Sequence, residues 1–163
     1  MANSSIIGVA KNKIIKEFIK DSEIVSAIGC SANETGEKLV NTHIFNYHQN
    51  PNTINDVKTF ITIQVHIPES YRFDSKIHVQ PKIEIWICSH EKHMIVDNVP
   101  KVTENRNDYL ARLIDEKLNG RDDFGIGKIK LISNIEGSFQ KDYLYRVLVF
   151  QGLDINDSLC KPE

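Results

Sequence analysis

Two stretches of strictly alternating hydrophobicity constrain the fold of this chain more than any other feature. Residues 59–67, TFITIQVHI, and residues 82–90, KIEIWICSH, place a branched aliphatic side chain at every second position. A period of two is typical of β-strands, because successive side chains point to opposite faces of the sheet. The apolar face is predicted to comprise Ile61, Ile63, Val65, Ile67, Ile83, Ile85 and Ile87. The opposite face is predicted to hold Phe60, Thr62, Gln64, His66, Lys82, Glu84, Trp86 and Cys88.

Three other segments show a helical period. Residues 5–20 carry an isoleucine-rich stripe opposite lysines, which indicates an amphipathic helix. Residues 23–28 form a short helix that Asp21-Ser22 can cap and Gly29 can end. Residues 105–120 form a third helix, with Asn105 or Asn107 as N-cap and Gly120 as its stop. Its apolar face is expected to be Leu110, Leu113, Ile114 and Leu118.

Two more strands, 127–133 and 143–151, close the chain and are joined through residues 134–142. The polar stretch 30–58 is predicted to be a loop, although LVNTHIFNY within it could hold a short strand. The order of elements lacks regular strand–helix–strand alternation, so we expect an α+β fold with a mainly antiparallel sheet of four or more strands and helices on one face. We treat residues 1–163 as a single domain, with an N-terminal helical segment 5–28, a core 58–151 and a C-terminal tail 152–163.

Composition narrows the range of partners. Twenty basic residues face 22 acidic ones, which does not favour a phosphate backbone as partner. Cys30, Cys88 and Cys160 are few, odd in number and far apart, as in proteins of a reducing compartment. The longest apolar runs are about four residues, against the ~20 needed to cross a bilayer. We therefore expect a cytosolic product with no membrane partner and no sequence-specific nucleic-acid partner.

The glycine-rich stretch NGRDDFGIGKIKLISN, residues 119–134, superficially resembles a phosphate-binding loop. That motif requires glycine five residues before Gly127, where Asp122 stands, and a hydroxyl residue after Lys128, where Ile129 stands. The segment that follows has the pattern of a strand, whereas bound phosphate rests on the start of a helix. We interpret the stretch as a helix stop at Gly120 followed by a flexible turn into a strand.

No motif of catalysis or metal binding is present elsewhere. His90 and His93 form an H-x-x-H pair, but no ligand cluster accompanies them, so solvated loop histidines are the expectation. Cys88 has no nucleophile signature around it and is expected to be a small buried residue. We therefore assign no catalytic, cofactor-binding or metal-binding residues, and no cofactor.

Two segments carry apolar and aromatic residues outside the predicted elements. The connection 68–81 holds Tyr71, Arg72 and Phe73, which are residue types favoured at interface hot spots. The tail 152–163 retains Leu153, Ile155 and Leu159. Loop aromatics often fold back over a core, and this alternative stays open. We predict that both segments contact neighbouring subunits.

The run ENRNDYLARLIDEKLNGRDDFGIGKIKLISNIEGSF, followed by DYLYRVLVF, together with the order of elements, resembles small neck and tail-terminator proteins of tailed phages. The resemblance spans roughly residues 5–155. It implies a non-enzymatic virion protein that forms a homo-oligomeric ring, often a hexamer, which terminates the tail tube and joins it to the head. The implied partners are the tail tube protein and neck or connector proteins. The implied location is the neck of the virion, after assembly in the host cytoplasm.

Two alternatives remain at this point. The first is a small enzyme or nucleic-acid-processing factor of a mobile element, whose site is assembled from distant residues. His66, Glu84, His90 and His93 are its candidate residues. The second is a small regulatory binding protein of a mobile element.

Overall fold

The structure, a computed structural model, describes residues 5–29, 36–67, 80–139 and 142–153. One five-stranded sheet runs through it in the order β1-β2-β3-β5-β4. The strands are β1 (Ile44–Phe45), β2 (Thr59–His66), β3 (Lys82–His90), β4 (Lys128–Ser138) and β5 (Tyr143–Leu153). All neighbouring pairs are antiparallel except β1–β2, which is parallel. The α+β fold with a mainly antiparallel sheet is thus confirmed, and the sheet is mixed because of one two-residue strand.

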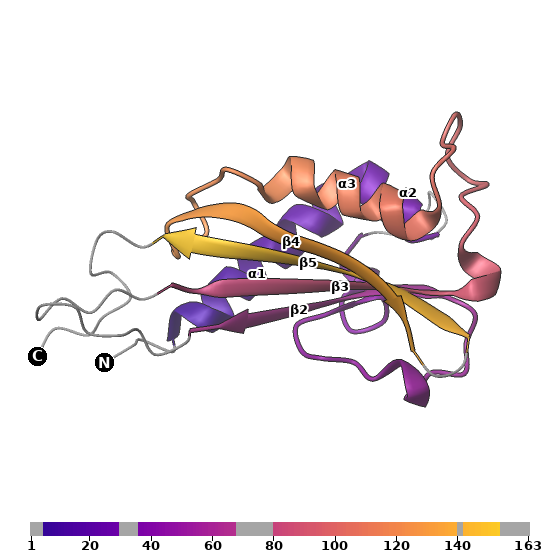
Figure 1. Cartoon of the computed structure of the whole chain (residues 1–163), viewed down its shortest axis with the longest axis horizontal. Helices are drawn as coiled ribbons and strands as arrows, with labels where there is room; N and C mark the ends of the chain where they lie inside the picture. Colours follow the sequence, from indigo (N-terminus) through magenta and orange to yellow (C-terminus); the bar gives the residue numbers. More distant parts are fainter. Residues whose placement is uncertain (1–4, 30–35, 68–79, 140–141, 154–163) are drawn as a thin grey trace, which may run out of the picture.

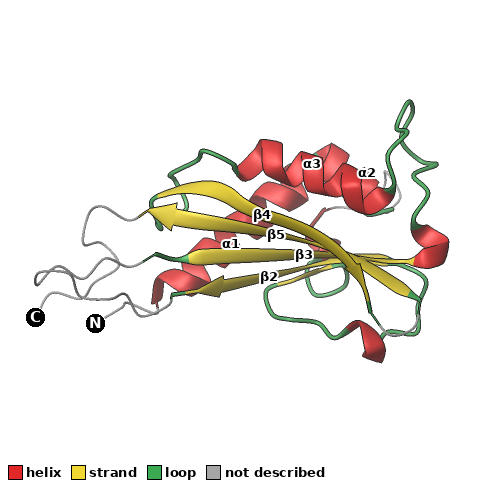
Figure 2. Cartoon of the chain, in the orientation of Figure 1, coloured by secondary structure: helices red, strands yellow, loops and turns green. Residues whose placement is uncertain are grey.

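Helices cover one face of this sheet. The helices are α1 (Ser5–Lys20), α2 (Ser22–Ala27) and α3 (Arg106–Leu118), and Figure 2 shows them in red on the same side of the yellow strands. Three single turns of 3-10 helix lie in the connections: η1 (Gly36–Leu39), η2 (Pro51–Thr53) and η3 (Glu91–His93). None of the helices in the described part is long and apolar enough to cross a membrane.

The main core lies between the helices and the sheet. The face predicted from the alternation is the buried one: Ile61, Ile63, Ile83, Ile85 and Ile87 are all fully buried there. Helix side chains complete the core, among them Ile14, Phe18, Leu110, Ile114 and Leu118. Burying one such side chain stabilises a fold by roughly 1.5–3 kcal/mol. This apolar layer is therefore what fixes the position of the helices on the sheet.

The helix ends follow the expected chemistry. The Asp21 carboxylate accepts from the N–H groups of Glu23 and Ile24 and caps α2, which begins at Ser22. Asn105, rather than Asn107, caps α3 by accepting from the Asp108 N–H at 2.9 Å. Gly120 stops α3 with a left-handed φ of 84°, as predicted.

The predicted connection 134–142 is wrong in its first half. The structure continues β4 through Ser138, so residues 134–138 pair with β5 instead of forming a loop. The cause is that β4 is an edge strand with a solvated outer side, so it needs no alternating apolar pattern. Gly137 lies opposite Tyr145, whose ring occupies the place that a side chain at 137 would take. β5 likewise extends two residues beyond the predicted end, to Leu153.

Candidate interaction surface

Five of the six predicted interface residues, Tyr71, Arg72, Phe73, Ile155 and Leu159, lie outside the described residues. Leu153 is the last residue of β5 and pairs with Lys128 of β4. The assignment of these residues to subunit contacts therefore stays a prediction. The structure does locate the points from which the two predicted segments depart.

Both segments depart from the same end of the sheet. The Gly152 N–H donates to the Pro81 carbonyl at 2.8 Å, and the Gln151 side chain donates to that of Gln80 at 2.7 Å. In Figure 1 this end is on the left, where β5 ends and β3 begins. Residues 68–79 and the tail after Leu153 therefore start from one shared place. A head-to-tail ring would need a second, different patch elsewhere on the molecule.

The face of the sheet opposite the helices carries an aromatic cluster, which we define as Phe45, Phe60, Trp86, Phe139, Tyr143 and Tyr145 with Cys88. The rings contact one another with centroids 4.7–6.0 Å apart. Part of the polar stretch predicted as a loop supplies Phe45 and Ile54 to this cluster. The face of β5 opposite the helices is therefore apolar at this end of the sheet, where the rings of the cluster pack on it.

Cys88 is a buried member of that cluster, as predicted. It is 1% exposed, and burial raises the pKa of its thiol well above the ordinary value. A buried thiol of this kind contributes to core packing, and little of it is present as thiolate at neutral pH.

Beyond the aromatic cluster, β4 leaves apolar side chains in solvent. Ile132 is 51% exposed and Ile135 is 59% exposed. Ile132 is the extra residue of a β-bulge, since Leu131 pairs with Phe150 and Ser133 with the adjacent Val149. An unpaired sheet edge that carries exposed apolar side chains can pair with another chain.

The helix side of the same strand is polar. A hollow of about 470 Å³ lies between the start of α3 and the ends of β4 and β5. Arg146 crosses it, donating to Asn134 at 2.8 Å and to Glu136 at 2.9 Å, and it also pairs with Asp108. Two carboxylates share this one guanidinium, so the hollow has a surplus of negative charge.

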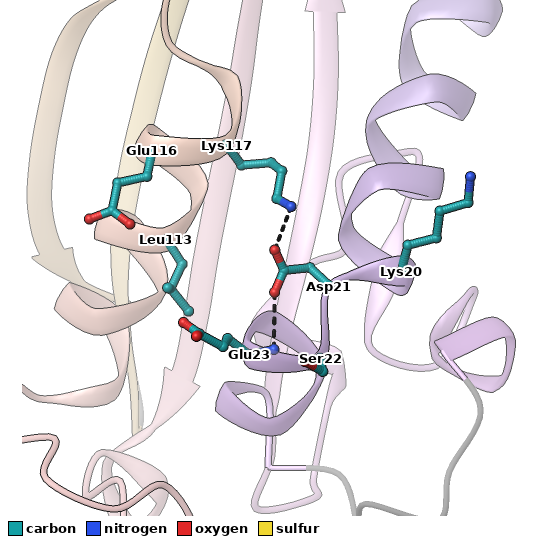
Figure 3. A pocket seen from close by; sticks show the side chains of 7 residues that line it. All are labelled: Lys20, Asp21, Ser22, Glu23, Leu113, Glu116 and Lys117. Carbon is teal, nitrogen blue, oxygen red and sulfur yellow. Dashed lines mark hydrogen bonds and ion pairs between the residues drawn. The ribbon is translucent and has the colours of Figure 1, made fainter.

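A second hollow, of about 550 Å³, lies between the α1–α2 junction and α3 (Figure 3). Its lining is held together by an ion pair in which Lys117 Nζ lies 2.5 Å from the Asp21 carboxylate. Partial burial opposes ionisation of Asp21, but the bonds from Lys117 and the α2 amides outweigh it, and the pKa lies below its ordinary value. Asp21 and Lys117 are therefore engaged in joining two helices.

The candidate residues of the enzyme alternative do not form one site. His66 and Glu84 lie at one end of the sheet, with His66 Nε2 3.8 Å from the Glu84 carboxylate. His90 is the last residue of β3, eight residues or about 26 Å along the strand from Lys82, and His93 lies just beyond it in η3. In the described part of the chain, no group of three or more histidine, cysteine and acidic residues is placed to hold a metal ion.

The expectation of solvated histidines is wrong for His90 and holds only in part for His93, which is half-buried. His90 is 8% exposed, and its Nδ1 accepts from the Lys92 N–H at 3.1 Å. His93 bonds to the Thr59 hydroxyl at 2.8 Å. Burial first, and the nearby Arg106 second, lower the pKa of His93 below its ordinary value. Both rings are structural parts of the junction between β3 and α3.

Arg106 is a structural part of this junction that the sequence did not reveal. It is 1% exposed, and its guanidinium donates to three backbone carbonyls, those of His93, Ala27 and Ile95, each at 2.6 Å. It thus joins the end of α2 to the segment that leads into α3. The available signal was its place at the first helical position, where a cation is unfavourable beside the positive end of the helix dipole.

The glycine-rich stretch forms a turn that ion pairs and buried side chains hold in place. Gly120, Gly125 and Gly127 all have positive φ, and Phe124 and Ile126 are buried beneath them. Arg121 pairs with Asp123 at 2.5 Å and with Glu17 of α1 at 2.6 Å. A turn into a strand is confirmed, but one tied to α1 rather than flexible.

With this geometry established, the comparisons with known proteins decide the family. The family model YomW matches residues 10–151. The chain belongs to the YomW family. YomW is a phage-derived family. The match takes in the aromatic cluster, all of β4 and residues 68–81, and it ends before Leu153, Ile155 and Leu159.

The fold is also that of a solved particle component. The structure is similar to a chain of the "Virion of native gene transfer agent (GTA) particle", with a TM-score of 0.59 and 11% sequence identity. The similarity covers 93% of this chain and 98% of that one. No curated protein matches the sequence. The YomW family and this shared fold together support a phage structural protein, in agreement with the resemblance seen in the sequence.

Proposed function

We propose that the protein is a non-enzymatic structural component of a phage-type particle, and that it forms a closed ring at the neck. There it ends the tail tube and meets the head, with the tail tube protein and neck or connector proteins as partners. Its location is the virion, after assembly in the host cytoplasm. The observation that carries the proposal is the near-complete overlap of its fold with a chain of a virion particle.

Two features of the surface support assembly. The departing segments at one end of the sheet and the exposed isoleucines of β4 provide two different patches on one subunit. Different patches on one subunit generate head-to-tail contacts, which close into rings when the rotation between subunits divides a full turn. A ring of this kind suits a position around a tail tube.

Electron microscopy of the purified protein across a concentration series, near physiological salt, tests the proposal. We expect closed rings of one size, with sixfold symmetry. The same series is repeated with the tail tube protein added, since a tube can act as template. If the protein remains monomeric in both series, the ring proposal is wrong.

A further inference from the structure

The second half of β4 presents a row of unpaired backbone groups. Ser133, Ile135 and Gly137 face their partners on β5, and the Phe139 N–H donates to the Tyr143 carbonyl at 2.9 Å. Antiparallel pairing alternates along a strand, so the N–H and C=O groups of the intervening residues point away from the sheet. Those residues are Asn134, Glu136 and Ser138. Within the described ranges, no backbone group bonds to this outer edge.

In the first half of β4, by contrast, the outward backbone groups are already hydrogen-bonded within the subunit. The Ile129 N–H donates to the Arg121 carbonyl at 2.8 Å, and the Gly120 N–H donates to the Ile129 carbonyl at 2.8 Å. The Asn119 side chain accepts from the Leu131 N–H at 3.2 Å. Lys128 and Lys130 add charge there, a common device against unwanted pairing. The open edge is therefore confined to residues 133–138.

We propose that residues 133–138 of β4 bind residues 68–79 of a neighbouring copy, which add a strand to the sheet. The inference rests on the proposed ring and specifies the contact from which it is built. Addition of a strand to an exposed edge is a common mode of recognition, in which main-chain bonds give affinity and alternate side chains give specificity.

The two partners match in pattern and charge. Around the open edge, Ile135 is exposed on one face, and the carboxylates of Glu136 and Asp108 lie on the helix side. Within residues 68–79, apolar residues at 71, 73, 77 and 79 alternate with a mainly cationic set, Arg72, Asp74, Lys76 and His78, in which two cations accompany one carboxylate. Extended chain would place the apolar set against Ile135 and the cationic set toward Glu136. This complementarity selects the occupant.

The C-terminal tail is a poorer match for this edge. Residues 154–163 contain Asp154, Asp157 and Glu163 against one lysine, so they would add negative charge beside Glu136. They also lack the alternation of apolar and cationic residues. Like charges directly across a strand pair are destabilising.

Proline substitution tests whether the open edge of β4 is the surface that binds the neighbouring copy. Glu136→Pro removes an outward N–H, which an edge strand tolerates, while Glu136→Gln removes only the charge. We expect Glu136→Pro to raise the concentration needed for ring formation at least about tenfold, because interchain backbone bonds are lost, and Glu136→Gln to raise it less, by about threefold, because only the charge contact is lost. Sedimentation velocity measures assembly, and circular dichroism at low concentration confirms that both monomers fold.

The outcomes separate the two proposals. If the wild type forms rings and Glu136→Pro forms them at the same concentration, the edge is not the contact and this inference is wrong, while the ring stands. If the wild type forms no rings even with a tail tube, both fail together.

Disulfide trapping tests whether residues 68–79 of a neighbouring copy are the segment that binds the open edge. In a chain carrying Cys30→Ser and Cys160→Ser, with the buried Cys88 retained, Ile135→Cys and Ile77→Cys or Phe73→Cys are placed on separate molecules and mixed under mild oxidation. We expect a crosslinked dimer at least about fivefold above that formed with Asp154→Cys, since a disulfide needs Cβ atoms ~4 Å apart. Equal or greater crosslinking to Asp154→Cys assigns the edge to the tail and overturns the inference. An intramolecular crosslink in a double variant at high dilution shows that the segment binds its own edge, which also overturns it.

Discussion

Both halves of β4 pair with β5, yet their outer edges differ: the edge of the first half is covered, and the edge of the second half is open. Before the bulge at Ile132, the outer edge is occupied by the turn that leaves α3, and Ile129 is fully buried. After the bulge, the edge is open and Ile135 is exposed. The difference shows that the edge of this sheet is blocked where the monomer can cover it, and that the remaining edge is the part available to another chain.

The sharpest test of this comparison is a pair of matched truncations. We expect Ile129→Ala to lower the free energy of unfolding by about 2–4 kcal/mol, because it opens a cavity in the core. Ile135→Ala should change it by less than about 0.5 kcal/mol in the monomer, since its side chain is exposed. Urea denaturation at low protein concentration measures both. Equal losses in the two variants would contradict the division of the strand.

A smaller effect is expected where the turn caps the first half. Asn119→Ala removes the acceptor for the Leu131 N–H and should cost about 0.5–1.5 kcal/mol. Hydrogen exchange gives the local result: the Leu131 amide should exchange faster in Asn119→Ala than in the wild type. Asn134→Ala, in the open half, serves as control and should leave the Leu131 amide unchanged. Slow exchange of the Asn134, Glu136 and Ser138 amides in the wild-type monomer would show that the edge is already occupied.

The smallest effect concerns the ion pair of the same turn. The bonds from Arg121 lower the pKa of Asp123, so its contribution to stability is present above the unfolded pKa of about 4 and is lost as the pH falls through the folded pKa. Because the carboxylate is 56% exposed, the contribution should be below about 0.5 kcal/mol at neutral pH. The difference in urea midpoint between wild type and Asp123→Asn should therefore vanish in acid. A difference that grows as the pH falls would contradict this sign.

Sequence patterns predicted the covered parts of the molecule better than the open ones. The alternation in 59–67 and 82–90 assigned both faces of β2 and β3 correctly, because burial under helices demands an apolar row. Residues 134–138 carry no such row, since an edge strand held by backbone pairing accepts polar residues, and the sequence suggested a loop there. β1 is two residues long and depends on tertiary contacts with β2. Its position could be suggested but its parallel pairing could not.

The candidate surface was predicted to a lesser degree. Tyr71, Arg72 and Phe73 were selected by residue type, and their role in contacts stays a prediction. The open edge of β4 could not be found from sequence, because an unpaired backbone leaves no mark in the side chains. Arg106 was missed for a related reason. Its partners are carbonyl groups, which every residue possesses, so only its unfavourable place at a helix start hinted at a buried role.

The bulge at Ile132 has a consequence for how the length of this chain can vary. Because Ile132 is the extra residue, its deletion would restore a regular ladder and leave every other side chain of β4 on its present face. A single deletion at Ile135 would instead send the residues beyond it to the opposite face. Natural relatives that are shorter by one residue in this strand should therefore have lost the bulge. In such relatives the edge of β4 would be less twisted, so it would suit a neighbouring chain that approaches at a different angle.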